Sequence, residues 1–254
     1  MKIENVLITG MSGLIGRALR RQLQGRYRLR ALNRREVPDV ETHRADIQDL
    51  DAIEGAFDGI DAVVHLAARS DSAASWQEVR DFNVIGTYNV FEACRRSGVQ
   101  RIVYASSGAT VSGYEAFPPY DALAEGRYDD LPEQWRILTH EDPTRPASLY
   151  ACSKVWGEAL ARHYSDAFGM SVICLRIGYV NQADRPQNPR QFSVWCSQAD
   201  IAQMIDRAIA APDDLRFDVF FVTSRNRYGY RDISHGRDVL GFQPRDAAED
   251  HRGG

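Results

Sequence analysis

The sequence predicts an α/β fold in which helices cover both faces of a doubly wound parallel sheet, with a small C-terminal portion added. Short apolar runs alternate with helix-period segments along most of the 254 residues, a pattern typical of βαβ units. The first run, Ile3–Ile8, passes into a glycine-rich turn and then a helical segment, Arg17–Leu23. A later run, Arg101–Ala105, ends in two serines, at the sheet edge where such folds bind ligands.

The glycine-rich turn has the spacing G-x-x-G-x-x-G. Its glycines permit a tight turn and close approach of a pyrophosphate, and the free amides at the start of the next helix face that charge. Because the turn opens the first βαβ unit, it predicts dinucleotide binding by a Rossmann-type sheet; the alternative is a plain loop between strand and helix. The expected cofactor contacts here are Gly10, Ser12, Gly13, Leu14, Ile15 and Gly16.

The second strand, Tyr27–Leu32, is followed by Asn33, Arg34 and Arg35. An acid at this place would hold the ribose hydroxyl of NAD, whereas arginine accommodates the 2′-phosphate of NADP. We therefore expect NADP, with NAD possible; the alternative is that both arginines are merely solvated. Asp46, after a third short strand, is expected to accept a hydrogen bond from the adenine or to cap the helix that follows.

A fourth strand, Asp61–Leu66, ends in small residues that would let a nicotinamide ring lie close. We interpret His65 in this run as a hydrogen-bonded core histidine rather than a catalyst. The cofactor contacts expected around these strand ends are Ile47, Leu66, Ala67 and Ala68.

Tyr150 and Lys154 are four residues apart, on one face of a predicted helix. The chain has only two lysines, Lys2 and Lys154. A neighbouring ammonium favours the phenolate, so we expect Lys154 to lower the pKa of Tyr150 from about 10 and make it a general acid or base. Alone, this pair could be two surface residues; beside a dinucleotide site it indicates catalysis.

A long helix is predicted over Ser75–Ser97, carrying Asn83 and ended by Gly98. The segment from Tyr114 to Pro146 interrupts the α/β rhythm. A loop of this length in one domain is usually a functional lid or disordered, and its aromatic residues favour at least partial packing.

The later part of the chain continues the alternation. Strands are predicted at Ser171–Arg176 and Phe217–Val222, with a helix near 198–211 whose N-cap is Ser197, and a short helix after Asp232. We therefore divide the chain into a dinucleotide-binding domain, residues 1–176 with the lid-like insertion 114–146, and a small substrate-binding portion, residues 177–254, interleaved with the core.

Bulk properties exclude several classes of protein. A net charge of −4 with mixed signs gives no basic surface for nucleic acid. No apolar run approaches the roughly 20 residues that cross a bilayer, so neither a membrane partner nor a signal peptide is expected. The four widely spaced cysteines show no metal-ligand pattern, which predicts no metal site and a reducing, cytoplasmic location.

Taken together, the motifs resemble an extended short-chain dehydrogenase/reductase of the NAD-dependent epimerase/dehydratase family, over nearly the whole length. They are the glycine turn, Asp46, His65-Leu66-Ala67-Ala68, Asn83-Val84-Ile85-Gly86-Thr87, Ser106-Ser107, and Tyr150 with Lys154. The resemblance implies that Ser107, or else Ser106, orients the substrate oxygen, that Tyr150 transfers the proton, and that Lys154 binds the nicotinamide ribose. It adds Asn83 and Ile177 as cofactor contacts and implies a homodimer through two long helices.

The layout is similar to the smaller uronate and aldose dehydrogenases. In those enzymes an arginine at the place of Arg190 grips the substrate carboxylate and a serine at the place of Ser70 touches its hydroxyls. This chain departs from them in having Gly108-Ala109 after the serine, where uronate dehydrogenases have Asn-His. A sugar-like hydroxyl or carbonyl substrate is therefore expected, but not specifically a uronate.

Two other functions fit the same motifs. One is a sugar epimerase or dehydratase that retains its nicotinamide through a cycle without net redox change. The other is a non-catalytic NADP-binding regulatory protein, which would have no need of the complete Ser/Tyr/Lys set.

Overall fold

Seven parallel strands form one sheet in the order β3-β2-β1-β4-β5-β6-β7. The computed structural model describes residues 2–71 and 73–252. The chain order reverses between β1 and β4, which creates the crevice at the carboxyl edge where doubly wound sheets bind ligands. The strands are β1 (Asn5–Thr9), β2 (Arg28–Asn33), β3 (Glu41–Arg44), β4 (Ala62–His65), β5 (Arg101–Ser107), β6 (Ser171–Ile177) and β7 (Phe217–Val222).

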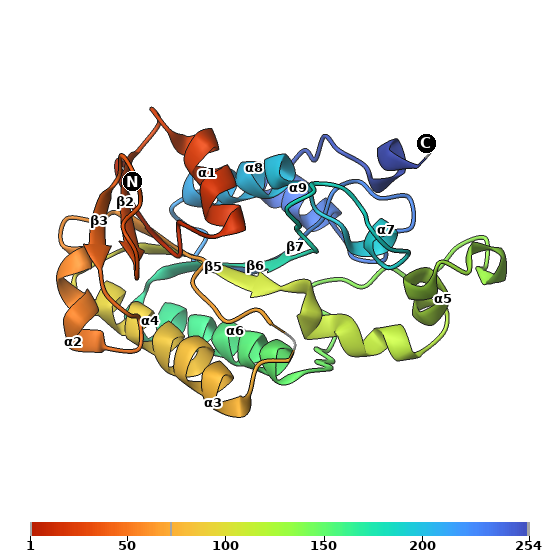
Figure 1. The fold of residues 1–254 in the computed structure, drawn as a ribbon, viewed down its shortest axis with the longest axis horizontal. Helices are drawn as coiled ribbons and strands as arrows, with labels where there is room; N and C mark the ends of the chain where they lie inside the picture. Colours follow the sequence, from red (N-terminus) through yellow and green to blue (C-terminus); the bar gives the residue numbers. More distant parts are fainter. Residues whose placement is uncertain (1, 72, 253–254) are drawn as a thin grey trace.

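Helices cover both faces of the sheet (Figure 1). On one face lie α1 (Leu14–Leu23), α8 (Gln198–Ile209) and α9 (Ser234–Leu240), and on the other α2 (Leu50–Ile53), α3 (Trp76–Glu78), α4 (Gly86–Arg96) and α6 (Leu149–Phe168). Two buried apolar clusters, one on each face, account for this layering, because the inner strands are apolar on both sides. No helix in the described part of the chain is long and apolar enough to cross a membrane.

Most predicted elements are confirmed with shifts of one or two residues. β7 occupies the predicted range, and Ser197 caps α8 by accepting a hydrogen bond from the Asp200 amide. The predicted long helix begins at its capping residue Ser75, but its centre, Val79–Ile85, is π-helical between α3 and α4. No residue pattern in this segment predicts a π-helix, so the sequence predicts an uninterrupted α-helix here.

The predicted insertion, residues 114–146, packs against the rest of the protein, as its aromatic residues indicated. It contains the end of the 3₁₀ segment η3 (Gly108–Ala116), then α5 (Tyr120–Glu125) and η4 (Tyr128–Asp130), before α6 begins. Its apolar side chains form a third buried cluster with residues of η3, α7 (Gln191–Val194), β7 and the segment after β7. The members of this cluster are Val111, Tyr120, Leu123, Leu138, Val194, Phe221 and Tyr230.

Candidate active site

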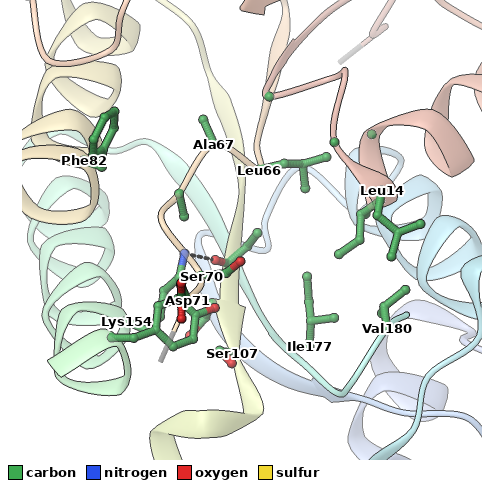
Figure 2. Close-up of a pocket in the computed structure, with 18 of the residues that line it drawn as sticks. Leu14, Leu66, Ala67, Ser70, Asp71, Phe82, Ser107, Lys154, Ile177 and Val180 are labelled. Atoms are coloured by element: carbon green, nitrogen blue, oxygen red, sulfur yellow. Dashed lines mark hydrogen bonds between the residues drawn. The ribbon is translucent and has the colours of Figure 1, made fainter. Parts of the chain in front are cut away.

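A cavity of about 1100 Å³ follows the carboxyl edge of the sheet. The glycine turn lies at one end and two arginines, Arg190 and Arg231, at the other. Every predicted site residue lines it except Asn83. Figure 2 shows Lys154 and Ser70 gathered on one side of the view and Leu14 on the other. One cavity therefore brings together residues from both ends of the chain.

The glycine turn has the close packing that a dinucleotide requires. Gly10 has a φ of +71°, and a Cβ there would lie 3.0 Å from the backbone of Ala67. A Cβ on Gly16 would lie 2.5 Å from the carbonyl oxygen of Met11. Helix α1 begins immediately after Gly13, so its free amides face the cavity. These residues fit a bound pyrophosphate, because glycines let the turn pack closely against Ala67 and Met11 and leave the amides at the start of α1 open to the cavity.

The loop after β2 is fixed by Asn33 and leaves two arginines exposed at the cavity rim. The amide of Asn33 donates to the Arg35 carbonyl at 2.7 Å and contacts the Ser12 hydroxyl at 3.2 Å. The guanidinium of Arg34 lies 5.3 Å from the centre of the Phe82 ring. Neither Arg34 nor Arg35 forms a salt bridge with another described residue. Both are therefore available to an anionic group of a cofactor.

Asp46 does not cap the helix that follows it, contrary to one of the two expectations. Asp49 is the N-cap of α2, accepting a hydrogen bond from the Ala52 amide. Asp46 instead accepts hydrogen bonds from the Gln48 amide and side chain at 3.1 and 3.0 Å, and lines the cavity beside Ile47.

His65 is a buried structural residue, as predicted. Its ring nitrogens contact the hydroxyls of Thr9 at 2.8 Å and Thr87 at 3.2 Å. Burial, with a smaller effect from the charge of Lys154, lowers the pKa of His65 to about 3. The ring is therefore neutral at physiological pH. The residues that follow it, Leu66 to Ala68, line the cavity together with Ile177.

Asn83, which was expected to contact the cofactor, lies outside the cavity lining. Its amide donates at 3.0 Å to both the Arg69 carbonyl and the Ser153 hydroxyl, and its oxygen accepts from the Arg69 amide at 2.7 Å. All of its polar atoms are thus used to tie the loop after β4 to α6. Asn83 positions the helix that carries Tyr150.

The two serines at the end of β5 have different partners. Ser106 is buried and donates a 2.6 Å hydrogen bond to Glu158, which also binds Arg176 through two hydrogen bonds of 2.8 and 2.9 Å. Ser107 is partly exposed, accepts a hydrogen bond from the Ala109 amide and interacts with the Tyr150 hydroxyl. Ser107, the serine chosen from the sequence, is therefore the one free to contact a substrate.

The expected acidification of Tyr150 is wrong for the free protein. Burial raises the pKa of Tyr150, and the neighbouring Ser107 hydroxyl only partly opposes this. The ammonium of Lys154 is 5.7 Å from the centre of the Tyr150 ring and donates instead to the Ala105 carbonyl at 2.7 Å. Burial also lowers the pKa of Lys154 to about 8, with Glu158 acting in the other direction. Sequence spacing placed both groups in one site, but it could not show how strongly both are desolvated.

The arginine predicted to hold a substrate carboxylate already holds one. Arg190 donates to Glu115 from Nε at 2.6 Å and from a terminal nitrogen at 2.8 Å. The sequence reasoning also missed Arg231, whose guanidinium lies where a side chain on Gly108 would be, with a terminal nitrogen 2.0 Å from the Cβ position. Arg231 is 124 residues away from Ser107, and no motif marks it.

A Rossmann-type sheet with this glycine turn and a clustered Ser107, Tyr150 and Lys154 defines an NAD(P)-dependent dehydrogenase/reductase of the extended short-chain type. The profile of the NAD dependent epimerase/dehydratase family matches residues 6–190. The chain belongs to this family.

Characterised relatives match it over nearly its whole length. The chain is 33% identical to an L-arabinose 1-dehydrogenase (NAD(P)(+)) of Haloferax volcanii, covering 95% of this chain and 96% of the relative. It is 32% identical to an NAD-dependent glucose-6-phosphate dehydrogenase of the same organism, covering 95% and 93%. A crystal structure of a mutant uronate dehydrogenase from Agrobacterium tumefaciens complexed with NAD has a TM-score of 0.84 at 33% identity, covering 99% of this chain and 88% of that one.

Proposed function

We propose that the chain transfers hydride reversibly between NADP(H) and a hydroxyl or carbonyl group of a sugar-like substrate, with NAD(H) as a poorer cofactor. The observation that carries this proposal is the meeting of Ser107, Tyr150 and Lys154 at one cavity with the glycine turn. The names of the relatives, which include arabinose, glucose-6-phosphate and uronate dehydrogenases, support a sugar-like substrate.

When bound, the nicotinamide supplies the hydride donor or acceptor, and the chain supplies the proton and the orientation. In reduction, Ser107 donates a hydrogen bond to the carbonyl oxygen and Tyr150 gives that oxygen its proton. In oxidation, the carbinol proton passes to the Tyr150 phenolate as the C–H bond breaks. Because burial raises the pKa of Tyr150, the free protein holds the neutral phenol, which is the form that reduction needs.

The preference for NADP is supported by Arg34 and Arg35. Both are exposed at the rim beside the end of β2, and the described chain offers neither of them a salt bridge. Two guanidiniums can hold a 2′-phosphate through charge-assisted, forked hydrogen bonds. No carboxylate stands at this place to favour the ribose hydroxyl of NAD.

The polar lining near Tyr150 supports a hydroxylated substrate. Ser70, Ser112 and Ser148 all line the cavity near the catalytic residues. Hydroxyls both donate and accept hydrogen bonds, so they suit the ring and chain hydroxyls of a sugar.

The direct experiment is an assay of nicotinamide absorbance with a panel of sugars, sugar phosphates, uronates and ketones, using both cofactors. We expect turnover of at least one sugar-like compound and a higher kcat/KM with NADP than with NAD. Turnover of simple ketones alone would contradict the substrate class. Cofactor that co-purifies and resists dialysis, together with isomerisation of a sugar without net change in absorbance, would contradict net oxidoreduction.

A homodimer and a cytoplasmic location also belong to this proposal. Large apolar side chains are exposed on the two long helical segments: Ile85 and Tyr88 around the start of α4, and Leu149 and Phe168 at the ends of α6. A second copy would cover these side chains, and light scattering at two protein concentrations tests this. All four cysteines are free thiols, as in a reducing compartment.

A further inference from the structure

Two arginines and one glutamate meet at the substrate end of the cavity. Glu115 lies in η3, Arg190 immediately before α7, and Arg231 between β7 and α9. Glu115 accepts the two hydrogen bonds from Arg190 and a third from the Tyr230 hydroxyl. A terminal nitrogen of Arg231 remains 3.8 Å from the nearer Glu115 oxygen. The Glu115 carboxylate is therefore hydrogen-bonded to Arg190, whereas Arg231 has only a long contact with it.

This arrangement leaves Arg231 with unsatisfied donor capacity in a buried place. The residue is 6% exposed, and its Nε has no hydrogen-bond partner among the described residues. Among the described side chains, its further contacts are a 3.3 Å hydrogen bond to the Tyr230 hydroxyl and the Tyr230 ring, whose centre is 5.2 Å from the guanidinium carbon. Burial acts to raise the pKa of Glu115, but Arg190, Arg231 and Tyr230 together lower it, so the carboxyl is ionised and the cluster has two positive charges against one negative. A buried cation without a full partner is costly unless a ligand supplies one.

Gly108, next to the catalytic serine, leaves the space in which the guanidinium of Arg231 lies. A Cβ at Gly108 would lie 2.0 Å from one terminal nitrogen of Arg231 and 2.5 Å from its guanidinium carbon. Gly108 directly follows Ser107, and consecutive Cα atoms are about 3.8 Å apart. Only a residue without a side chain allows the guanidinium to lie here. The positive charge is thus held next to the serine that would bind the reacting oxygen.

We propose that Arg231 binds a carboxylate of the substrate at a position one or two carbons from the reacting carbon, while Arg190 is held by Glu115. This inference rests on the proposed function, which places the reacting carbon beside Ser107 and Tyr150. It narrows the substrate class to hydroxylated carboxylic acids that are oxidised near the carboxylate. Arg231 presents a planar fork that matches a carboxylate.

The test uses three probes with the wild-type protein saturated with NADP⁺: D-gluconate, whose carboxylate adjoins its carbinols; D-glucuronate, whose carboxylate is across the ring from C1; and neutral D-glucose. Calorimetry measures binding, and nicotinamide absorbance measures turnover. We expect gluconate to bind at least 10-fold more tightly than glucose. Gluconate binding no tighter than glucose binding would overturn the proposal without any variant.

Two variants then assign the effect to Arg231. Arg231→Gln should weaken gluconate binding roughly 10- to 100-fold, the consequence of losing a charge-assisted hydrogen bond, and leave glucose binding within about 3-fold. Arg237→Gln, which removes an exposed arginine of α9 outside the cavity, is the matched control and should change neither. Equal losses for both probes, or an Arg231 effect on glucuronate alone, would overturn the proposal.

Folding and function are separated by two further readouts. Unchanged NADP⁺ affinity shows that Arg231→Gln is folded; if it is not, Arg231→Lys retains the charge without the fork and should reduce, but not abolish, the preference for gluconate. An Arg231-dependent affinity for gluconate without turnover of any probe would refute the proposed function and leave the carboxylate site standing. Turnover of sugars that is independent of Arg231 would do the reverse.

Discussion

The ammonium of Lys154 donates a 2.7 Å hydrogen bond to the backbone carbonyl of Ala105. Lys154 lies on α6 with Tyr150, and Ala105 lies on β5 two residues before Ser107. The bond therefore joins the helix that carries the phenol to the strand that carries the serine. Lys154 is buried, and burial lowers its pKa to about 8. Hydroxyls of a bound cofactor at this place would accept further hydrogen bonds from the ammonium.

Replacement of Lys154 by Met should remove this link while retaining the buried apolar stem. We expect kcat to fall by about 100-fold or more, the usual contribution of an assisted proton transfer, with weaker NADP⁺ binding. Steady-state kinetics and fluorescence titration measure the two effects. Cys152→Ala, on the exposed side of the same helix, is the control, and an equal loss in that variant would show that the helix, not the ammonium, is responsible.

Replacement of both Arg34 and Arg35 by Ala should weaken NADPH binding by roughly 10- to 100-fold and NADH binding by less than about 3-fold, since only NADPH carries the 2′-phosphate. Binding titrations with both cofactors measure this. A double variant of Arg207 and Arg237, exposed on α8 and α9, removes the same charge elsewhere. Equal losses for NADPH and NADH would contradict the role in cofactor choice.

The two serines of β5 should differ in their effect on catalysis. Ser106→Ala removes a buried donor to Glu158, so the free energy of unfolding should fall by about 1–2 kcal/mol with little change in kcat. Ser107→Ala should lower kcat by about 10-fold or more, with a loss of about 1 kcal/mol in the free energy of unfolding because the Ala109 amide loses its acceptor. Denaturant unfolding and initial rates measure both quantities; the reverse pattern would assign the catalytic role to Ser106.

His65 should make the protein less stable in acid. The pKa of His65 is about 3 in the folded chain and 6.5 in the unfolded one, so between these values the unfolded chain binds the extra proton. Stability should therefore fall as the pH drops below 6.5, by up to about 1.4 kcal/mol per pH unit from this residue. In denaturant unfolding at several pH values, the free energy of unfolding of His65→Gln should fall less steeply below pH 6.5 than that of the wild type. His163→Gln, an exposed control, should follow the wild type. The same pH dependence of the free energy of unfolding in the wild type and His65→Gln would contradict a lowered pKa of His65.

The sheet and the glycine turn that lines the cavity could be predicted from the sequence because their signals are local. The strand Phe217–Val222 is recognised from its own run of apolar residues. The Ser197 cap depends only on residues within one helical turn of it. The glycine turn likewise contains its own conformational requirement, confirmed by the positive φ of Gly10. Short-range patterns of this kind determine local structure with little influence from tertiary contacts.

The part of the cavity lined by Arg190 and Arg231 could not be predicted because its contacts join distant segments. The Arg190–Glu115 pair spans 75 residues, and the contact of Arg231 with Gly108 spans more than a hundred. The direction of the Tyr150 pKa also depended on burial, which a four-residue spacing does not reveal. Tertiary packing decided each of these features.

The central claim is that the Tyr150 hydroxyl transfers the proton to or from the substrate beside the nicotinamide. Replacement of Tyr150 by Phe removes only that hydroxyl and leaves the ring packing in place. With the best substrate of the panel, we expect turnover of Tyr150→Phe to fall by at least about 100-fold, while its NADP⁺ dissociation constant stays within about 3-fold of the wild type. Wild-type turnover by a properly folded Tyr150→Phe protein would contradict the account.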